Sequence, residues 1–209
     1  MTHRYAVLRS LLAALVAASS FTGCAPLLVG GAAVGGAMLV VDRRSSGTQL
    51  EDQAIELKAM NRTREVLGER GHVNATSYNR QVLLTGEVDN EADRSAVEQT
   101  VGKIDNLRGV VNELAVMGVS SLTARSNDTI LTGKVKATFV DARDIEATAF
   151  KVLTERGTVY LMGRVTEREG NRAAELARRV AGVQKVVRVF DTISDAELAE
   201  LRSRVTPKR

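Results

Sequence analysis

The sequence predicts an α+β protein made of two copies of one small unit, each with the element order αββαβ. The segment VLLTGEV at 82–88 returns as VYLMGRV at 159–165, 77 positions later. The match extends to both sides with apolar and polar positions in phase, and an offset of 76 pairs Asp52 with Asp128. Nearly all charged positions change while the apolar period stays, which indicates a preserved scaffold and not a preserved polar reaction centre.

The first copy opens with a helix that we expect to start at 45–48, with acidic Glu51 and Asp52 in its first turn, where they suit the helix dipole. Two strands follow, at about 72–77 and 81–88, joined by a polar turn at 78–80. A second helix covers about 91–104, and 110–117 forms the last strand. The expected core positions of the two helices are Ile55, Ala59, Met60, Val66 and Leu67, then Val97, Val101 and Ile104.

The second copy follows the same course. We expect a helix at about 128–140, strands at 149–155 and 158–165, a helix at 167–181 and a strand at 185–192. Residues 118–125 form a linker, and a charged tail at 195–209 contains a short amphipathic helix. Each copy has about 65–70 residues, near the lower limit for a self-sufficient core, so we expect the two copies to pack together.

Residues 1–23 have the features of a signal peptide: basic Arg4 and Arg9, an apolar run and small residues before Cys24. The site resembles a bacterial lipobox, with Phe21 where leucine is usual, and this implies lipidation of Cys24. The alternative is an unpaired thiol behind an ordinary signal. Ala25 after the cysteine implies a lipid-anchored protein of the outer membrane that faces the periplasm.

An apolar Gly/Ala-rich stretch at 26–41 lies in a tether that we assign to 24–47. Sixteen residues are short for a membrane span, which needs about 20. The stretch is therefore interpreted as an interfacial or flexible segment, with a transmembrane helix as the alternative.

Each copy places Gly86 or Gly163 after an apolar strand, then a helix with an acidic start, then a closing strand at Gly109-Val110 or Gly182-Val183. This order resembles the BON domain. Two such domains behind a lipobox, at 48–117 and 126–194, resemble the dual BON-domain outer-membrane lipoproteins of the DolP type. The resemblance implies that each copy packs a three-stranded mixed sheet against two helices. It also implies binding of anionic phospholipid through the first helix of the second domain, in support of envelope integrity.

The two copies carry opposite charge. Residues 48–117 hold 8 Lys/Arg against 12 Asp/Glu, a net of −4, and residues 118–194 hold 13 against 9, a net of +4. Screening limits such fields to about 8–10 Å, so the basic balance matters for a surface that touches the second copy, such as anionic phospholipid headgroups. Nucleic acid is not expected as a partner, because aromatic residues make up 3% of the chain and tryptophan is absent.

The first helix of the second copy carries the candidate binding residues. Leu131 and Val135 take the core positions of Ile55 and Ala59, which turns Ile130 and Lys134 toward solvent. An exposed isoleucine can enter a membrane interface while a lysine one turn later meets phosphate. The expected phospholipid-binding residues are Ile130, Lys134, Phe139 and Val140. In the alternative, Ile130 and Val140 complete the local core or face the first copy, and Lys134 is merely solvated. Ala54 replaces Ile130 in the first copy, so the two helices should differ in membrane affinity.

No catalytic constellation, metal site, cofactor site or small-molecule site is predicted. His72 is the one histidine beyond the signal, and we expect it at the surface or a strand edge. No Cys/His cluster has metal-ligand spacing, and no serine lies in a Gly-x-Ser-x-Gly elbow. The sequence thus favours a non-enzymatic protein. The alternative to lipid binding is a protein-interaction adaptor whose first copy docks an envelope assembly such as the β-barrel insertion machinery.

Overall fold

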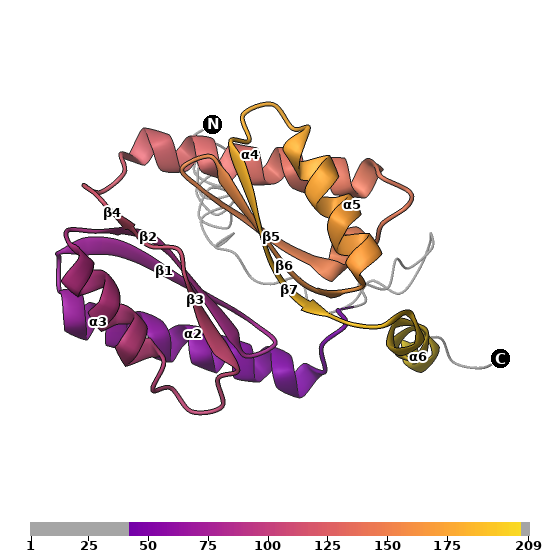
Figure 1. Cartoon of the computed structure of the whole chain (residues 1–209), viewed down its shortest axis with the longest axis horizontal. Coiled ribbons are helices and arrows are strands. Elements are labelled where there is room, and N and C mark those ends of the chain that lie inside the picture. The colour runs from indigo at the N-terminus through magenta and orange to yellow at the C-terminus, as the bar shows by residue number, and fades with distance from the viewer. Residues whose placement is uncertain (1–41, 206–209) are drawn as a thin grey trace, which may run out of the picture. The chain divides into compact units, whose positions relative to one another are not determined.

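The computed structural model of this chain describes residues 42–205, which form two αββαβ repeats followed by helix α6 (Asp195–Val205) (Figure 1). The first repeat contains α2 (Ser46–Leu67), β1 (Gly71–Tyr78), β2 (Gln81–Val88), α3 (Glu91–Val101), β3 (Gly109–Asn112) and β4 (Ala115–Val116). The second contains α4 (Leu122–Asp141), the 3₁₀ turn η2 (Ala147–Ala149), β5 (Phe150–Glu155), β6 (Thr158–Val165), α5 (Glu167–Arg178) and β7 (Lys185–Thr192). The predicted fold class is confirmed. The signal at 1–23, Cys24, the stretch at 26–41 and residues 206–209 lie outside the described residues.

In each repeat a mixed sheet packs one face against two helices (Figure 1). The central strand pairs antiparallel with the strand before it and parallel with the strand after the second helix, as in Val82↔Ser77 and Val82↔Val110. Alternate residues of the central strands, Val82 and Leu84 or Val159 and Leu161, point into the helix-covered cores. This alternation follows from the two-residue period of a strand.

The last strand of the first repeat differs from the expected 110–117, because it is interrupted between β3 and β4. The side chain of Asn112 accepts a hydrogen bond from the Leu114 amide at 3.2 Å and donates one to Glu98 Oε2 at 2.8 Å. This local turn lets Leu114 enter the core. Both pieces still pair with β2 in one register, since Gln81 faces Gly109 and Glu87 faces Ala115.

Three helix boundaries also differ from the prediction. Helices α3 and α5 end three residues early, at Val101 and Arg178, although Ile104 remains buried beyond the helix. Helix α4 starts at Leu122, inside the segment expected as linker, where the Ser121 side chain accepts a hydrogen bond from the Ala124 amide and caps the helix. On α2, Met60 is exposed, although it was expected in the core. Thr63 is buried on the core face of this helix instead.

Asp52 is not a first-turn residue of α2 but a buried acceptor in the second turn. Its carboxylate accepts hydrogen bonds from the amides of Asn79 and Arg80, at 2.8 and 2.7 Å, and from Ser77 Oγ at 2.6 Å. Asn79 and Arg80 form the β1–β2 turn with φ of 51° and 64°, a conformation that leaves their amides pointing together. In the second repeat, Asp128 accepts from both turn amides of the β5–β6 hairpin in the same way.

Replacing Asp52 by Ala is expected to lower the free energy of unfolding by about 3 kcal/mol, because several buried donors lose a charged acceptor. Glu51→Ala is the control, since the neighbouring Glu51 accepts only an exposed hydrogen bond from Asn106. Urea denaturation at pH 7 measures both. Equal effects of the two substitutions would contradict the assigned role.

The Asp52 contribution is also expected to depend on pH. Burial alone would raise the pKa of Asp52, but the bonds from Ser77, the turn amides and Arg44 outweigh it and hold the pKa below its usual value. A carboxyl with a lowered folded-state pKa stabilises the fold above its unfolded pKa, and this stability is lost as pH falls through the folded pKa. The stability gap between wild type and Asp52→Ala should therefore be full above about pH 4 and shrink in stronger acid.

The second faces of the two sheets meet in an apolar cluster. It consists of Tyr78, Leu83, Tyr160, Met162 and Val189. Polar pairs surround it: Lys151 Nζ lies 2.7 Å from Glu56 Oε1, and Arg156 Nη1 lies 2.9 Å from the fully buried Glu87 Oε1. The expected mutual packing of the repeats is therefore confirmed.

Residues 42–47, expected as the end of the tether, are part of the fold. The Arg43 side chain is 2% exposed and forms a bidentate pair with Glu169 of α5, both contacts at 2.8 Å. Arg44 bonds Asp52 in the first repeat at 2.7 Å, and its guanidinium lies 4.2 Å from the centre of the Tyr78 ring. We call residues 42–45 the clamp, because they contact both repeats.

Candidate functional site

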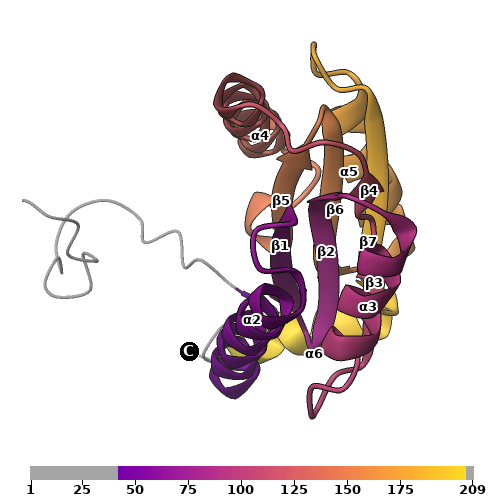
Figure 2. The same ribbon diagram turned by 90° about the vertical axis from the view of Figure 1, so that its left-hand side faces the viewer.

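Helix α4 lies across the second sheet with one face in the core and the other in solvent. Its buried residues are Asp128, Leu131, Val135 and Phe139, which recur every three or four positions and so share one face. In Figure 2, α4 is seen nearly end-on, and no other labelled element lies on its outer side. The outer face is therefore the surface available for binding.

Three of the four predicted binding residues lie on this outer face. Ile130 is 58% exposed, Val140 is 71% exposed, and Lys134 is exposed. Ile130, Lys134 and Ala137 follow the i, i+4, i+7 spacing that aligns side chains along a helix, and Val140 lies one turn after Ala137. The exposed fractions show that Ile130 and Val140 do not complete the local core, so that part of the alternative is wrong.

Phe139 is a correction, because it does not belong to the exposed set. It is 1% exposed, and its ring makes an edge contact with Phe150 at a centroid distance of 5.3 Å. The sequence already contained the signal. Leu131, Val135 and Phe139 follow one another at four-residue spacing, so the assignment of the first two to the core also places the third there.

The lysines of α4 are free cations. Lys134 and Lys136 are exposed, and neither forms an ion pair with any residue of the described range 42–205. Some arginines of the second repeat are paired with carboxylates instead, as in Arg172 with Asp144 and Arg179 with Glu175. The two ammonium groups flank Val140 and Ile130, which combines apolar and cationic contacts on one helix face.

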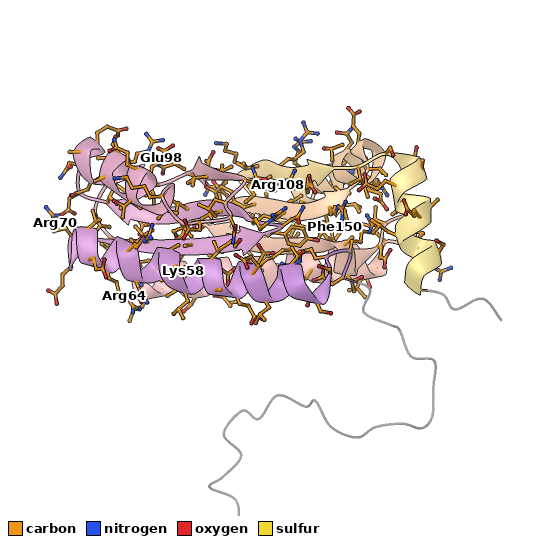
Figure 3. All side chains as sticks on the ribbon, turned by 90° about the horizontal axis from the view of Figure 1, so that it is seen from below. Lys58, Arg64, Arg70, Glu98, Arg108 and Phe150 are labelled. Atoms are coloured by element: carbon orange, nitrogen blue, oxygen red, sulfur yellow. The ribbon has the colours of Figure 1, made fainter. Side chains whose placement is uncertain are left out.

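Several exposed apolar residues were not predicted. Leu122 projects from the first turn of α4, which sequence reasoning had placed in the linker. On α2, Leu50 and Leu57 are exposed, and their seven-residue spacing places them two helical turns apart. Figure 3 labels Lys58 and Arg64 on the same helix. Their seven-residue spacing is visible in the sequence, but it lies off the core stripe of α2 that the apolar period predicts.

His72 lies on β1, an edge strand of its sheet, as expected. Burial lowers the pKa of His72, with a further lowering by Arg125 that Glu87 opposes. Within the part of the chain that the structure describes, no group of three or more His, Cys, Asp or Glu side chains is placed to hold a metal ion. Among the helices of residues 42–205, none is long and apolar enough to cross a membrane.

The duplicated fold matches a known family. The sequence profile of the BON domain matches residues 52–118 and 127–193. The chain therefore belongs to the BON-domain family, and it carries two copies of the domain.

Curated relatives narrow the class further. Outer membrane lipoprotein DolP of Haemophilus influenzae is 39% identical over 183 residues, which cover 86% of this chain and 94% of that protein. The 21 kDa hemolysin of Actinobacillus pleuropneumoniae is 30% identical over 155 residues, 73% of this chain and 80% of that protein. With this similarity over most of its length, the chain is a lipid-anchored lipoprotein of the outer membrane.

A solved structure of CdsD, a structural protein of the type III secretion system of Chlamydia trachomatis, aligns with 70% of this chain and 98% of its own length at 10% identity. Its TM-score of 0.28 is too low to carry an argument.

Proposed function

We propose that this lipoprotein is non-enzymatic, binds anionic phospholipid through the outer face of α4, and in this way supports envelope integrity. One observation carries the proposal: α4 exposes Ile130 and Val140 beside lysines that have no carboxylate partner among the described residues. The proposed binding residues are Ile130, Lys134, Lys136 and Val140. Phe139, which was expected in this set from the sequence, is buried and does not belong to it.

The chemistry of this face suits a lipid surface. Apolar side chains of an interfacial helix enter the boundary between headgroups and acyl chains. Each cation near an anionic leaflet contributes about 1 kcal/mol. A lipid anchor holds the helix close to the bilayer, so a weak contact is enough, because the second binding event becomes intramolecular.

Lys134→Glu and Ile130→Glu are each expected to weaken binding to anionic vesicles at least tenfold. Lys134→Glu reverses a charge, which changes about 2 kcal/mol of headgroup attraction. Ile130→Glu adds one repelled charge and also removes the apolar side chain that would enter the interface. Lys58→Glu is the matched control, because Lys58 holds the corresponding position on α2, 76 residues earlier. Co-sedimentation with phosphatidylglycerol vesicles at low ionic strength measures the three variants, and neutral phosphatidylcholine vesicles give the background.

The chain for this measurement begins at Asp42 and carries no acyl group. A start at Ser46 would remove the clamp, with its buried Arg43. The proposal fails if wild type ignores anionic vesicles, or if Lys58→Glu weakens binding as much as Lys134→Glu.

A second candidate function is docking of an envelope protein assembly by the first repeat. It is favoured by the exposed Leu50 and Leu57 on a repeat with a net charge of −4, which an anionic membrane would not attract. Direct binding to the purified β-barrel insertion machinery tests it. Leu57→Glu should abolish this binding and Ile130→Glu should retain it, while a wild-type chain that does not bind removes this candidate.

A further inference from the structure

Beside the exposed face of α4 lies an open groove of about 570 Å³. One wall is α4 with Ile130, Leu131 and Lys134. The other walls are the β5–β6 turn at Gly157 and the loop before β7 at Gly182. The groove therefore adjoins the proposed lipid-binding face and shares two of its residues, Ile130 and Lys134.

The first repeat explains why the second is open here. In the first repeat, Asn106 of the loop before β3 donates a hydrogen bond from Nδ2 to Glu51 Oε1 of α2 at 3.0 Å. This bond spans the gap between loop and helix. The corresponding residues 76 positions later are Gly182 and Asn127, and glycine has no side chain that could span it.

Two further replacements enlarge the difference. The β1–β2 turn ends at Arg80, whereas the β5–β6 turn ends at Gly157, with φ of 64° and 69°. Ile130 stands where the first repeat has Ala54. Two side chains are thus absent from one side of the gap, and an apolar side chain is added on the other. These differences open the groove in the second repeat.

The groove combines an apolar lining with one free cation. Ile130, Leu131 and the two glycines supply the apolar surface, and the ammonium of Lys134 is unpaired within residues 42–205. The other charged groups in the lining are engaged. The Asp128 carboxylate accepts hydrogen bonds from the amides of Arg156 and Gly157. The Arg156 guanidinium donates a hydrogen bond to the Glu87 carboxylate.

We propose that this groove seats one anionic phospholipid, with the phosphodiester at Lys134 and the glycerol end of the acyl chains against Ile130 and Leu131. The inference rests on the proposed function and refines it from adsorption on a surface to recognition of a single molecule. An anion without a tail would leave the apolar walls unused, and an uncharged tail would leave Lys134 unused.

The test transplants the closure of the first repeat into the second with Asn127→Glu/Gly182→Asn. A Cβ at Gly182 would meet only Leu131, at 3.5 Å, which is ordinary contact. The φ of 103° at Gly182 strains any side chain, so the loop must shift toward the φ of 66° that Asn106 has in the first repeat. Ser126→Glu adds the same charge on the adjacent exposed residue, which does not line the groove. Circular dichroism and thermal unfolding of residues 42–209 establish that each variant is folded.

The probe is short-chain phosphatidylglycerol below its micelle concentration, followed by NMR of the Gly157 and Gly182 amides. Wild type is expected to show saturable shifts at these amides, Asn127→Glu/Gly182→Asn to bind at least tenfold more weakly, and Ser126→Glu to stay within about twofold of wild type. Gly182→Asn alone, which adds no charge, should also weaken binding.

Three results would overturn the groove. In the first, the folded Asn127→Glu/Gly182→Asn variant binds the lipid as well as wild type does. In the second, inorganic phosphate alone gives the same amide shifts as the lipid. In the third, wild type binds vesicles but does not bind the soluble lipid. The last result leaves the proposed function standing with α4 as a surface contact only. Failure of wild type to bind vesicles as well would remove both.

Discussion

Gly86→Ala is expected to lower the free energy of unfolding by about 3–5 kcal/mol, among the largest effects of any single methyl group in this chain. A Cβ at Gly86 would lie 2.0 Å from the carbonyl oxygen of His72, and the residue has φ of 114°, which L side chains rarely adopt. The backbone of β1 would have to move away from β2, so the pairing of Val73 with Gly86 would be lost.

Thermal and urea denaturation of residues 42–209 measure this effect. Gly163→Ala, at the same place in the second repeat, should cost less, because its Cβ would lie 2.5 Å from the Ala149 carbonyl oxygen and its φ is not positive. Gly133→Ala is the opposite control: this mid-helix glycine has open space around its Cβ, and alanine there should stabilise by about 0.5–1 kcal/mol. A loss below 1 kcal/mol for Gly86→Ala would show that the strand pair absorbs the methyl group.

Arg43→Ala is expected to lower the free energy of unfolding by about 3–5 kcal/mol, the range for removing one partner of a buried ion pair. Glu169, whose side chain is 3% exposed, would lose its bidentate partner. Burial favours a raised pKa for Glu169, and the Arg43 bonds outweigh this and lower it, so removal of Arg43 should return the pKa upward.

The matched control is Arg179→Ala, because the Arg179 side chain is 67% exposed and pairs with Glu175 from the C-cap position of α5. Exposed pairs contribute about 0–1 kcal/mol, so this variant should unfold close to wild type. Arg43→Met/Glu169→Met should recover much of the loss, because no unpaired charge is left in the interior. A loss for Arg43→Ala no larger than for Arg179→Ala would show that the buried pair is energetically neutral.

The strands were the most predictable part of this fold. β2, β6 and β7 have the predicted bounds, because strands with alternate residues in a core cannot shift between their turn residues without exposing core side chains. The start of α4 was not predictable from periodicity, since Leu122-Thr-Ala-Arg-Ser-Asn127 contains no apolar stripe and is held by the cap at Ser121. The interruption after β3 depends on a side-chain turn at Asn112 that an apolar pattern does not contain.

The candidate site divides in the same way. Helical spacing alone predicts that Ile130 and Lys134 lie on the solvent-exposed face of α4. The same spacing, continued from Val135, predicts that Phe139 lies in the core. The groove could not be predicted from spacing, because two of its walls are loops that are distant from α4 in the sequence. The Arg43–Glu169 pair joins residues 126 positions apart, and charged residues read from sequence are usually assigned to solvent.

The clamp also determines how a mechanical load would enter the protein. The described residues begin at Asp42, 18 positions after the predicted anchor at Cys24. The next two residues, Arg43 and Arg44, form ion pairs with different repeats. A pull from the bilayer is therefore divided between Glu169 of α5 and Asp52 of α2. Separating either repeat from the clamp would break an ion pair with a buried carboxylate. The clamp and the two repeats should therefore resist tension together.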